Sequence, residues 1–419
     1  MSNSTRPKAN DKAAVLESAR RHKAKDKVPL LAHATMRWGR KIRGTIRYFG
    51  KIDPALPDYG SGAALAEYHR TIDDLRAGRE PRPKDDERTT LGEAANKFLA
   101  AKASLRDSGE LRPMTWTDYH DTCSRIIAVL GKHRAVADLT PDDFRKLRAV
   151  FAKGRGPVTL AGDIRRAKAM FRFCETEGLI DRPCRYGAGF DLPTFTVLRQ
   201  ARAARGTRMF QPEEIRQLLD HADTAMKAMI LLGANCGFGQ TDLARLAQSV
   251  VDLKRGWIDY PRPKTGIPRR CPLWGETVAA LAAAIAARPE PRDPGDKDLV
   301  FLSPSGQPVV RDRLSTIEAK AEAGLTTHID TVARDFCKLI RAVNLEGGRG
   351  FYALRHGFQT VAEGCGDFPA VSSIMGHADA SIAARYREGI DDARLIAVTN
   401  HVRAWLWPNR RVGRRRKPR

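Results

Sequence analysis

The sequence predicts a multidomain, mainly α-helical protein with small β elements. A chain of 419 residues is long enough for two or three domains. Two segments rich in proline, glycine and charge, at 79–88 and 183–207, interrupt the apolar periodicity. The stretch before the first break alternates as strands do, whereas most of the remainder has helical spacing. These observations predict an N-terminal three-stranded β module, a helical domain and a mixed α/β domain.

The charge balance indicates a polyanionic partner. Lysine and arginine number 73 against 49 aspartates and glutamates, which gives a formal net charge of +24. Such an excess favours nucleic acid as the partner, and a basic protein that binds no nucleic acid is the alternative. No run of about 18 apolar residues occurs, so no membrane span is predicted.

The N-terminus lacks the apolar core of a secretory signal. The seven cysteines form no Cys-x-x-Cys pair and no spacing typical of disulfides, which indicates reduced thiols. We therefore expect a cytoplasmic, nucleoid-associated protein with no metal site and no cofactor.

The first 83 residues predict two parts. Residues 1–27 are polar and basic, and predict a flexible arm that contacts phosphates, with a helix over 13–25 as the alternative. Residues 28–83 predict a three-stranded sheet and then a helix over Gly62–Ala77. Cations interleave with the apolar strand positions and are predicted to contact DNA: Arg37, Arg40, Lys41, Arg43 and Arg47. A module used only for protein contacts is the alternative.

Residues 84–182 predict a block of four helices. Thr90 and Glu93 have capping-box spacing before the first. The second is expected over 115–130, the third opens at Thr140 and Pro141, and the fourth spans 158–177. The fourth helix carries a basic face that we expect to contact DNA: Arg165, Arg166, Lys168 and Arg172. An ordinary solvated face is the alternative reading.

A linker at 183–207 precedes the α/β domain, 208–407, and a basic tail, 408–419, follows it. Strands are expected over 250–259 and 269–273, on either side of a turn at 262–266. The expected helices begin at Gln211 and cover 225–235, 277–287, 331–343 and 393–407.

One stretch of this last domain carries a chemical constellation. Arg355, His377 and Tyr386 follow one another in that order, with Tyr386 nine positions after the histidine. A phenol, with its ordinary pKa of about 10, needs help from its surroundings to act as a nucleophile. A guanidinium fork and an imidazole donor stabilise the charge that develops when a phosphodiester is attacked. The set predicts Tyr386 as nucleophile; a core aromatic beside Arg385 is the alternative for Tyr386, and a structural histidine is the alternative for His377.

This stretch resembles the C-terminal motif of tyrosine recombinases, the phage-integrase family. There a His-x-Leu-Arg-His block precedes Leu-Gly-His and the nucleophilic tyrosine; here the sequence reads Tyr352-Ala-Leu-Arg355-His356, Met375-Gly376-His377 and Tyr386. The resemblance implies an arm-type DNA-binding module, a core-binding domain and a catalytic domain. It implies a site-specific recombinase or integrase that forms a 3′-phosphotyrosyl bond without metal or ATP. Double-stranded DNA sites and a tetramer assembled on DNA are the implied partners.

The resemblance also gives roles to two further residues. Lys264 lies in Pro-Lys-Thr-Gly, a typical version of the family's hairpin turn, whose lysine protonates the leaving 5′ oxygen. An ordinary surface lysine is the alternative. Tyr352 stands where the family usually has a histidine, and its phenol is still able to donate to a phosphate oxygen.

One position departs from the family pattern. The first catalytic arginine belongs to Gly-Leu-Arg-x-x-Glu-Leu, but here Gly239 takes its place while the acidic partner, Asp242, remains. Losing one such donor is expected to cost about 3–4 kcal/mol, or 100- to 1000-fold in rate. Gln240, Arg208 and Arg245 are candidates to substitute. The departure leaves open a DNA-binding protein descended from a recombinase, with weakened catalysis.

Overall fold

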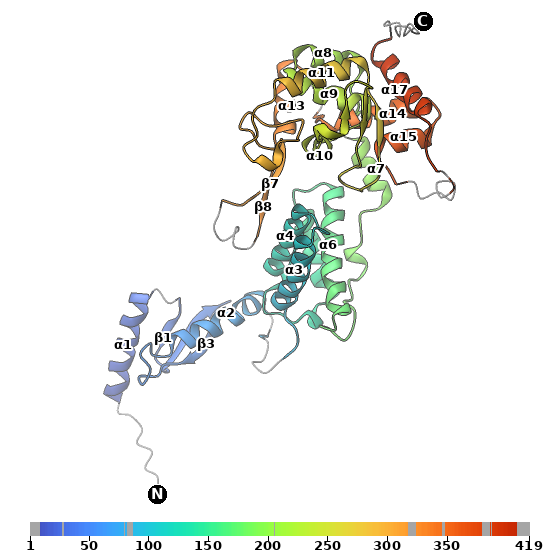
Figure 1. Cartoon of the computed structure of the whole chain (residues 1–419). Helices are drawn as coiled ribbons and strands as arrows, with labels where there is room; N and C mark the ends of the chain where they lie inside the picture. The colour runs from blue at the N-terminus through green and yellow to red at the C-terminus, as the bar shows by residue number, and fades with distance from the viewer. Residues whose placement is uncertain are drawn as a thin grey trace, which may run out of the picture. The chain divides into compact units, whose positions relative to one another are not determined.

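The computed structural model describes residues 9–26, 29–78, 80–81, 87–204, 206–316, 324–345, 348–378, 386 and 388–408. Helices dominate them, and three small antiparallel sheets complete the architecture (Figure 1). The predicted fold class is therefore confirmed. The chain divides into two compact units between Ala201 and Arg202, within the predicted linker. None of the described helices is both long and apolar enough to cross a membrane.

The first unit contains the predicted three-stranded sheet, in the order β1-β2-β3, followed by a helix. The bounds are β1 (Leu31–His33), β2 (Arg37–Ile42), β3 (Thr45–Lys51) and α2 (Ser61–Ala77). Arg43 and Gly44 turn β2 into β3, both with positive φ (48° and 86°). Trp38, Phe49 and Tyr68 are buried between the sheet and α2, which leaves the other face of the sheet open.

The predicted flexible arm is wrong for the part of it that the structure describes. Residues Ala9–Asp26 form a helix, α1. Ala19 is fully buried, and Val15 and Leu16 pack against the same core as the sheet. An alanine-containing run with helical spacing of its few apolar residues has a face to bury, so tertiary packing holds it as a helix. Residues 1–8 and 27 lie outside the described residues.

The four predicted helices of the first unit are present: α3 (Leu91–Asp107), α4 (Pro113–Leu130), α5 (Pro141–Ala152) and α6 (Pro157–Thr176). The capping box forms as predicted, since Thr90 Oγ1 accepts from Glu93 N at 3.2 Å and Glu93 Oε2 accepts from Thr90 N at 2.8 Å. The core contains many fully buried aromatic rings, among them Phe98, Phe144, Phe151 and Phe171.

The predicted linker is not wholly irregular. Phe190, in a short 3-10 turn (Ala188–Phe190), is fully buried in the core of the helical block. Residues Phe195–Ala203 form a further helix, α7. The first part of the predicted linker thus belongs to the helical core, because the Phe190 ring has an apolar site to fill.

A buried ion pair between Arg134 and Asp143 joins the start of α5 to the loop before it. Arg134 donates to Asp143 at 2.6 Å, and the side chains are only 10% and 7% exposed. The backbone N and Oγ1 of Thr140 donate to the same carboxylate oxygen. Burial opposes ionisation of Asp143, but these donors outweigh it and lower its pKa to about 2.

We expect Asp143→Ala to destabilise the helical block by about 3 kcal/mol, because Arg134 would remain buried without its partner. The folded-state pKa is depressed, so this stabilisation is present at neutral pH and is lost between about pH 4 and pH 2. Hydrogen exchange of the α3–α6 amides in the full chain measures both effects. Asp142→Ala, at an exposed carboxylate one residue away, is the control, and equal loss in both variants would contradict the prediction.

The second unit surrounds a largely buried helix, α9, against which α11 and α14 pack. Its helices are α8 (Pro212–His221), α9 (Thr224–Cys236), α10 (Gln240–Ala244), α11 (Gly275–Ala286), α13 (Thr331–Ala342), α14 (Tyr352–Glu363), α15 (Phe368–Met375) and α17 (Asp392–Leu406). A small sheet, in the order β4-β5-β6, contains β4 (Val251–Asp252), β5 (Trp257–Asp259) and β6 (Arg270–Pro272).

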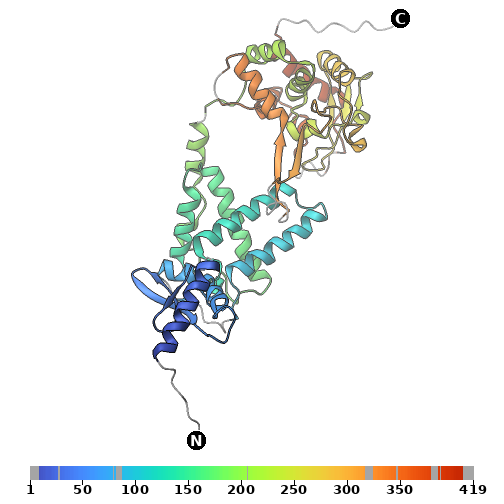
Figure 2. The same ribbon diagram turned by 90° about the vertical axis from the view of Figure 1, so that its left-hand side faces the viewer.

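Two features of this unit differ from the sequence expectation. The strand expected over 250–259 is two short strands, β4 and β5, because the chain turns back at Gly256, whose φ is 74°. A second hairpin, β7 (Val310–Leu314) and β8 (Thr326–Asp330), was not predicted. It extends from the body of the unit (Figure 2), and its strands carry mostly polar side chains.

Candidate active site

The junction between α9 and α10 forms one wall of the site. α9 ends at Gly237, whose φ of 64° is left-handed. The backbone N of Gly239 then donates to Asp242 Oδ2 at 2.8 Å and caps α10. Because of this tight turn, the carbonyl of Gly237 points toward Arg355 of α14. The Asp242 side chain is buried next to Gly239. This geometry needs no side chain at position 239.

Arg355 is fixed from several directions at the centre of the site. Its side chain lies on the first turn of α14 and the residue is 2% exposed. The guanidinium donates to the carbonyls of Gly237 and Met375 and contacts His377 Nε2 at 3.0 Å. Burial lowers its pKa, and the charge of Arg262 lowers it further, yet a guanidinium stays protonated in proteins. The structure therefore holds the predicted fork as a preoriented, desolvated cation.

His377 follows the helix-ending glycine of α15. Gly376 has a φ of 61°, and the backbone N of His377 donates to Ser372 O. Burial lowers the pKa of the imidazole, and the charges of Arg355 and Arg262 lower it further, so the ring is neutral at neutral pH. Since an arginine only donates, Nε2 is the acceptor and the ring proton lies on Nδ1. That N–H is left to donate elsewhere.

Lys264 is exposed on the turn between β5 and β6. The turn is attached beside His377, because Arg262 and Thr265 both donate to Gly376 O, at 3.4 and 3.3 Å. A Cβ at Gly376 would lie 2.9 Å from Arg262 Cβ, so the close approach requires glycine as well as the backbone angle does. The structure thus brings the lysine turn and His377 together.

Tyr352 lies against the position of the missing arginine. It begins α14 and is 44% exposed. A Cβ built at Gly239 would be 3.2 Å from the Tyr352 ring atom Cε2. The ring thus faces the direction that a side chain at 239 would take.

Arg269 was missed by the sequence reasoning. Its side chain is fully buried beside the rings of Phe238 and Tyr260, and its Nη2 lies 3.2 Å from Asp242 Oδ1. Asp242 is also 4.0 Å from Arg355 Nη1. The Asp242 carboxylate therefore lies close to two guanidinium groups, those of Arg269 and Arg355, which belong to other parts of the chain. The only signal in the sequence was the Arg269-Arg270 pair at the start of β6.

Tyr386 is 84% exposed, and residues 379–385 and 387 on either side of it lie outside the described residues. Within the described part of the chain, no contact joins Tyr386 to Arg355, His377 or Lys264. The structure thus brings Arg355, His377, Tyr352 and the turn that carries Lys264 into one region, and the joining of Tyr386 to them stays a prediction.

The predicted DNA-contacting residues of the sheet fall on two faces. Arg37 and Lys41 are exposed on the open face, where Arg37 lies 5.7 Å from the Tyr48 ring. Arg40 instead lies over Tyr68 of α2. Arg43 and Arg47 are exposed. DNA contact by these residues stays a prediction, and the open face is where the sheet offers it.

The basic face of α6 is less uniform than its sequence indicates. Arg165 and Arg172 are exposed. Arg166 donates to the fully buried Asp163 at 2.7 Å, and Lys168 lies 3.7 Å from Asp191. Arg166 and Lys168 therefore hold the helical block together, and Arg165 and Arg172 remain available for DNA.

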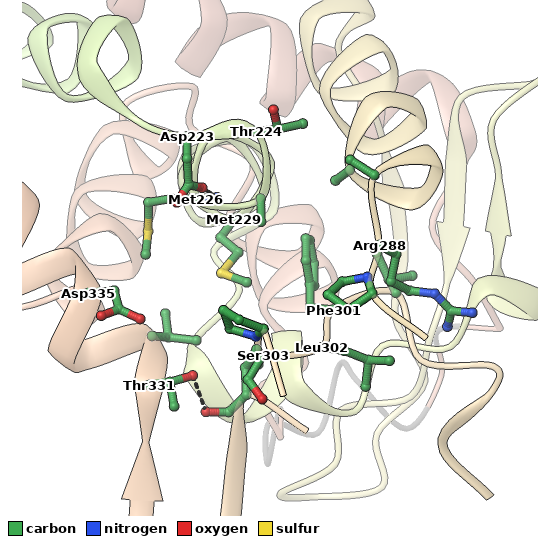
Figure 3. A pocket seen from close by; sticks show the side chains of 18 residues that line it. Asp223, Thr224, Met226, Met229, Arg288, Phe301, Leu302, Ser303, Thr331 and Asp335 are labelled. Carbon is green, nitrogen blue, oxygen red and sulfur yellow. Dashed lines mark hydrogen bonds between the residues drawn. The ribbon is translucent and has the colours of Figure 1, made fainter. Parts of the chain in front are cut away.

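A cavity of about 300 Å³, separate from the candidate active site, lies in the second unit (Figure 3). Met226, Met229 and Phe301 give it a mainly apolar lining, and Thr331 Oγ1 donates to Val309 O at its edge. None of the predicted catalytic residues lines it, and the arginine in its lining, Arg288, donates to the carbonyls of Lys297 and Leu299. Within the described ranges, no group of three or more His, Cys, Asp or Glu side chains is placed to hold a metal ion.

The sequence of this chain is similar to those of known proteins. Residues 208–391 match the phage integrase family. Tyrosine recombinase XerC of Alcanivorax borkumensis is 24% identical over 307 residues, which cover 70% of this chain and 88% of the relative. XerC of Mesorhizobium japonicum is 25% identical over 281 residues, which cover 64% of this chain and 81% of the relative.

Two solved structures share the fold. The Tn1549 transposon integrase in complex with transposon right end DNA has a TM-score of 0.53 at 17% identity, over 75% of this chain and all of that one. A lambda integrase tetramer bound to a Holliday junction has a TM-score of 0.52 at 15% identity, over 86% of this chain and 98% of that one.

Proposed function

We propose that this chain is a tyrosine recombinase that cuts and rejoins double-stranded DNA at specific sites, because residues 208–391 match the phage integrase family and a XerC recombinase is similar over 70% of the chain. One observation carries the proposal. Arg355 and His377 are in contact at 3.0 Å, and the Lys264 turn is attached at the adjoining Gly376 carbonyl. A guanidinium and an imidazole thus meet beside the turn that carries the Lys264 ammonium, and these are the groups that transfer of a phosphoryl group requires.

The chemistry follows from these groups. The Tyr386 hydroxyl gives its proton to solvent and its oxygen attacks the phosphorus, the bond to the 5′ oxygen breaks, and a 3′-phosphotyrosyl bond forms. Arg355 and His377 donate to the non-bridging oxygens, and the Tyr352 phenol is a further donor at the edge of the site. Lys264 gives a proton to the leaving 5′ oxygen. Attack by a free 5′ hydroxyl on the phosphotyrosine reseals the strand, with the bond energy conserved and no ATP consumed.

Covalent capture tests the proposal. A binding site is first selected from a random-sequence DNA pool, and a duplex with that site is nicked so that the cleaved end diffuses away and religation fails. A protein–DNA band on a denaturing gel supports the proposed function. DNA that is bound without any covalent band overturns it.

We expect Lys264→Ala to slow cleavage about 100- to 10,000-fold, because the 5′ alkoxide would leave without a proton. A 5′-bridging phosphorothiolate has a thiolate leaving group that needs no general acid, so on it the variant should equal the wild type. Single-turnover cleavage of the two substrates measures the difference. Lys254→Ala, at another exposed lysine of the unit, is the control. An equal loss on both substrates would remove Lys264 from the general-acid role.

A second candidate function is a DNA-binding protein with weakened catalysis. Gly239 favours it, because no guanidinium extends from the position next to Asp242. The retained contacts of Arg355, His377 and the Lys264 turn favour the recombinase. Specific DNA binding without covalent capture would select the second candidate.

Strand exchange needs two duplexes and four strand cleavages, so we propose four protomers on the recombining DNA. The lambda integrase neighbour is itself a tetramer bound to a Holliday junction.

A further inference from the structure

The site lacks the guanidinium that an arginine at position 239 would supply. The backbone of Gly239 shows from which side that arginine would have entered the site. Gly239 caps α10 through its backbone and carries no side chain. The Tyr352 ring faces the Cβ direction of Gly239 at 3.2 Å. A cation that replaces the absent arginine must therefore reach the phosphate past Tyr352.

A cavity of about 490 Å³ adjoins Tyr352 within the same unit. Arg208, Arg349, Tyr352 and His356 contribute its polar lining. Burial lowers the pKa of His356, and the charges of Arg208 and Arg355 lower it further. Arg208 is therefore within electrostatic range of the α14 turn that holds the catalytic fork. Its side chain is exposed, and no carboxylate in the described part of the chain lies within ion-pair distance of it.

The other arginines near Tyr352 and Arg355 are engaged. Arg349 donates through both ends of its fork to Glu214, at 2.7 Å each. Arg269 is fully buried and paired with Asp242. Arg262 donates to Gly376 O and holds the lysine turn. Arg245, the other arginine that the sequence offers as a substitute, does not line the cavity, so Arg208 is the exposed arginine that adjoins Tyr352 there.

We infer that Arg208 supplies the guanidinium that is absent at Gly239, by passing Tyr352 to donate to a non-bridging oxygen of the scissile phosphate. The inference rests on the proposed function, because it assigns a catalytic residue to that same reaction. An arginine from the segment that precedes α8 thereby takes the place of one from α10. The Tyr352 ring lies against Gly239 and lines the path of the incoming side chain.

We expect Arg208→Ala to slow single-turnover cleavage about 100- to 1000-fold at saturating DNA, the loss typical of one transition-state donor. A methylphosphonate at the scissile position replaces one charged oxygen with a methyl group and removes the charge that Arg208 would neutralise. On that substrate the variant should equal the wild type. Arg208→Lys keeps the charge without the fork and should be intermediate on the ordinary phosphate.

Arg255→Ala is the matched control, since Arg255 is an 84% exposed arginine of the same unit outside the cavity. Wild-type cleavage by Arg208→Ala overturns the inference and leaves the proposed function intact. A loss of the same size on phosphate and methylphosphonate also overturns it, because a merely structural role affects both substrates. Failure of the wild-type protein to form a covalent band overturns the proposed function, and the Arg208 role with it.

Discussion

Tyr386→Phe is expected to abolish covalent attachment to DNA while leaving DNA affinity unchanged. The substitution removes one hydroxyl oxygen, and without it no other atom of the ring attacks phosphorus. Because the side chain is 84% exposed, its hydroxyl makes no buried contact whose loss would unfold the domain. The variant should therefore separate binding from cleavage.

A nicked duplex and a denaturing gel measure the covalent product, and a gel shift on the intact duplex measures affinity. Tyr119→Phe removes a phenol oxygen from a partly buried tyrosine of the helical block and should retain full cleavage. A covalent band of undiminished intensity from Tyr386→Phe would mean that another side chain is the nucleophile.

The second large effect concerns Arg355. Arg355→Lys keeps the positive charge but loses the planar fork, which at present donates to Gly237 O and Met375 O and contacts His377. A lysine cannot satisfy these carbonyls and also donate twice to a phosphate. We expect cleavage to slow about 1000-fold, near the upper limit for a single preorganised donor.

Arg403→Lys is a suitable control, because Arg403 also forms a fork, with Glu276 at 3.1 and 2.6 Å, on a helix that carries no predicted catalytic residue. Thermal unfolding of both variants shows whether the fold is retained. If the two substitutions slow cleavage equally, Arg355 acts through stability and its catalytic role is wrong.

Local signals predicted the helices well. Helix starts could be predicted from Thr90 with Glu93 and from Thr140 with Pro141. Capping and the proline preference for the first helical turn depend only on residues within about four positions of each other. The β7–β8 hairpin had no such signal, because residues such as Arg311, Asp312 and His328 interrupt any apolar alternation. The helix Ala9–Asp26 was anticipated only as an alternative, over 13–25, because its few apolar residues predict burial only once the sheet they pack against is known.

The residues of the candidate site also fall into those that a local motif predicts and those that only contacts between distant positions reveal. Arg355 and His377 were predicted from spacing, because they lie 22 positions apart within one motif. The attachment of the lysine turn to Gly376 joins positions 114 and 111 residues apart, and no local pattern records such a contact. Arg269 was hidden for the same reason, since its partner Asp242 belongs to another element.

The cluster around Asp242 has a consequence for the free energy of the domain. The carboxylate lies 3.2 Å from Arg269 and 4.0 Å from Arg355, and the charge of Arg262 also acts on Arg355. Three positive charges face one negative charge in a poorly solvated region, which lowers the free energy of unfolding. A phosphodiester that enters the site offsets the imbalance, so bound DNA stabilises the fold. The pentacoordinate transition state gathers more charge on its oxygens than the diester does, and the same imbalance then favours the transition state over the substrate.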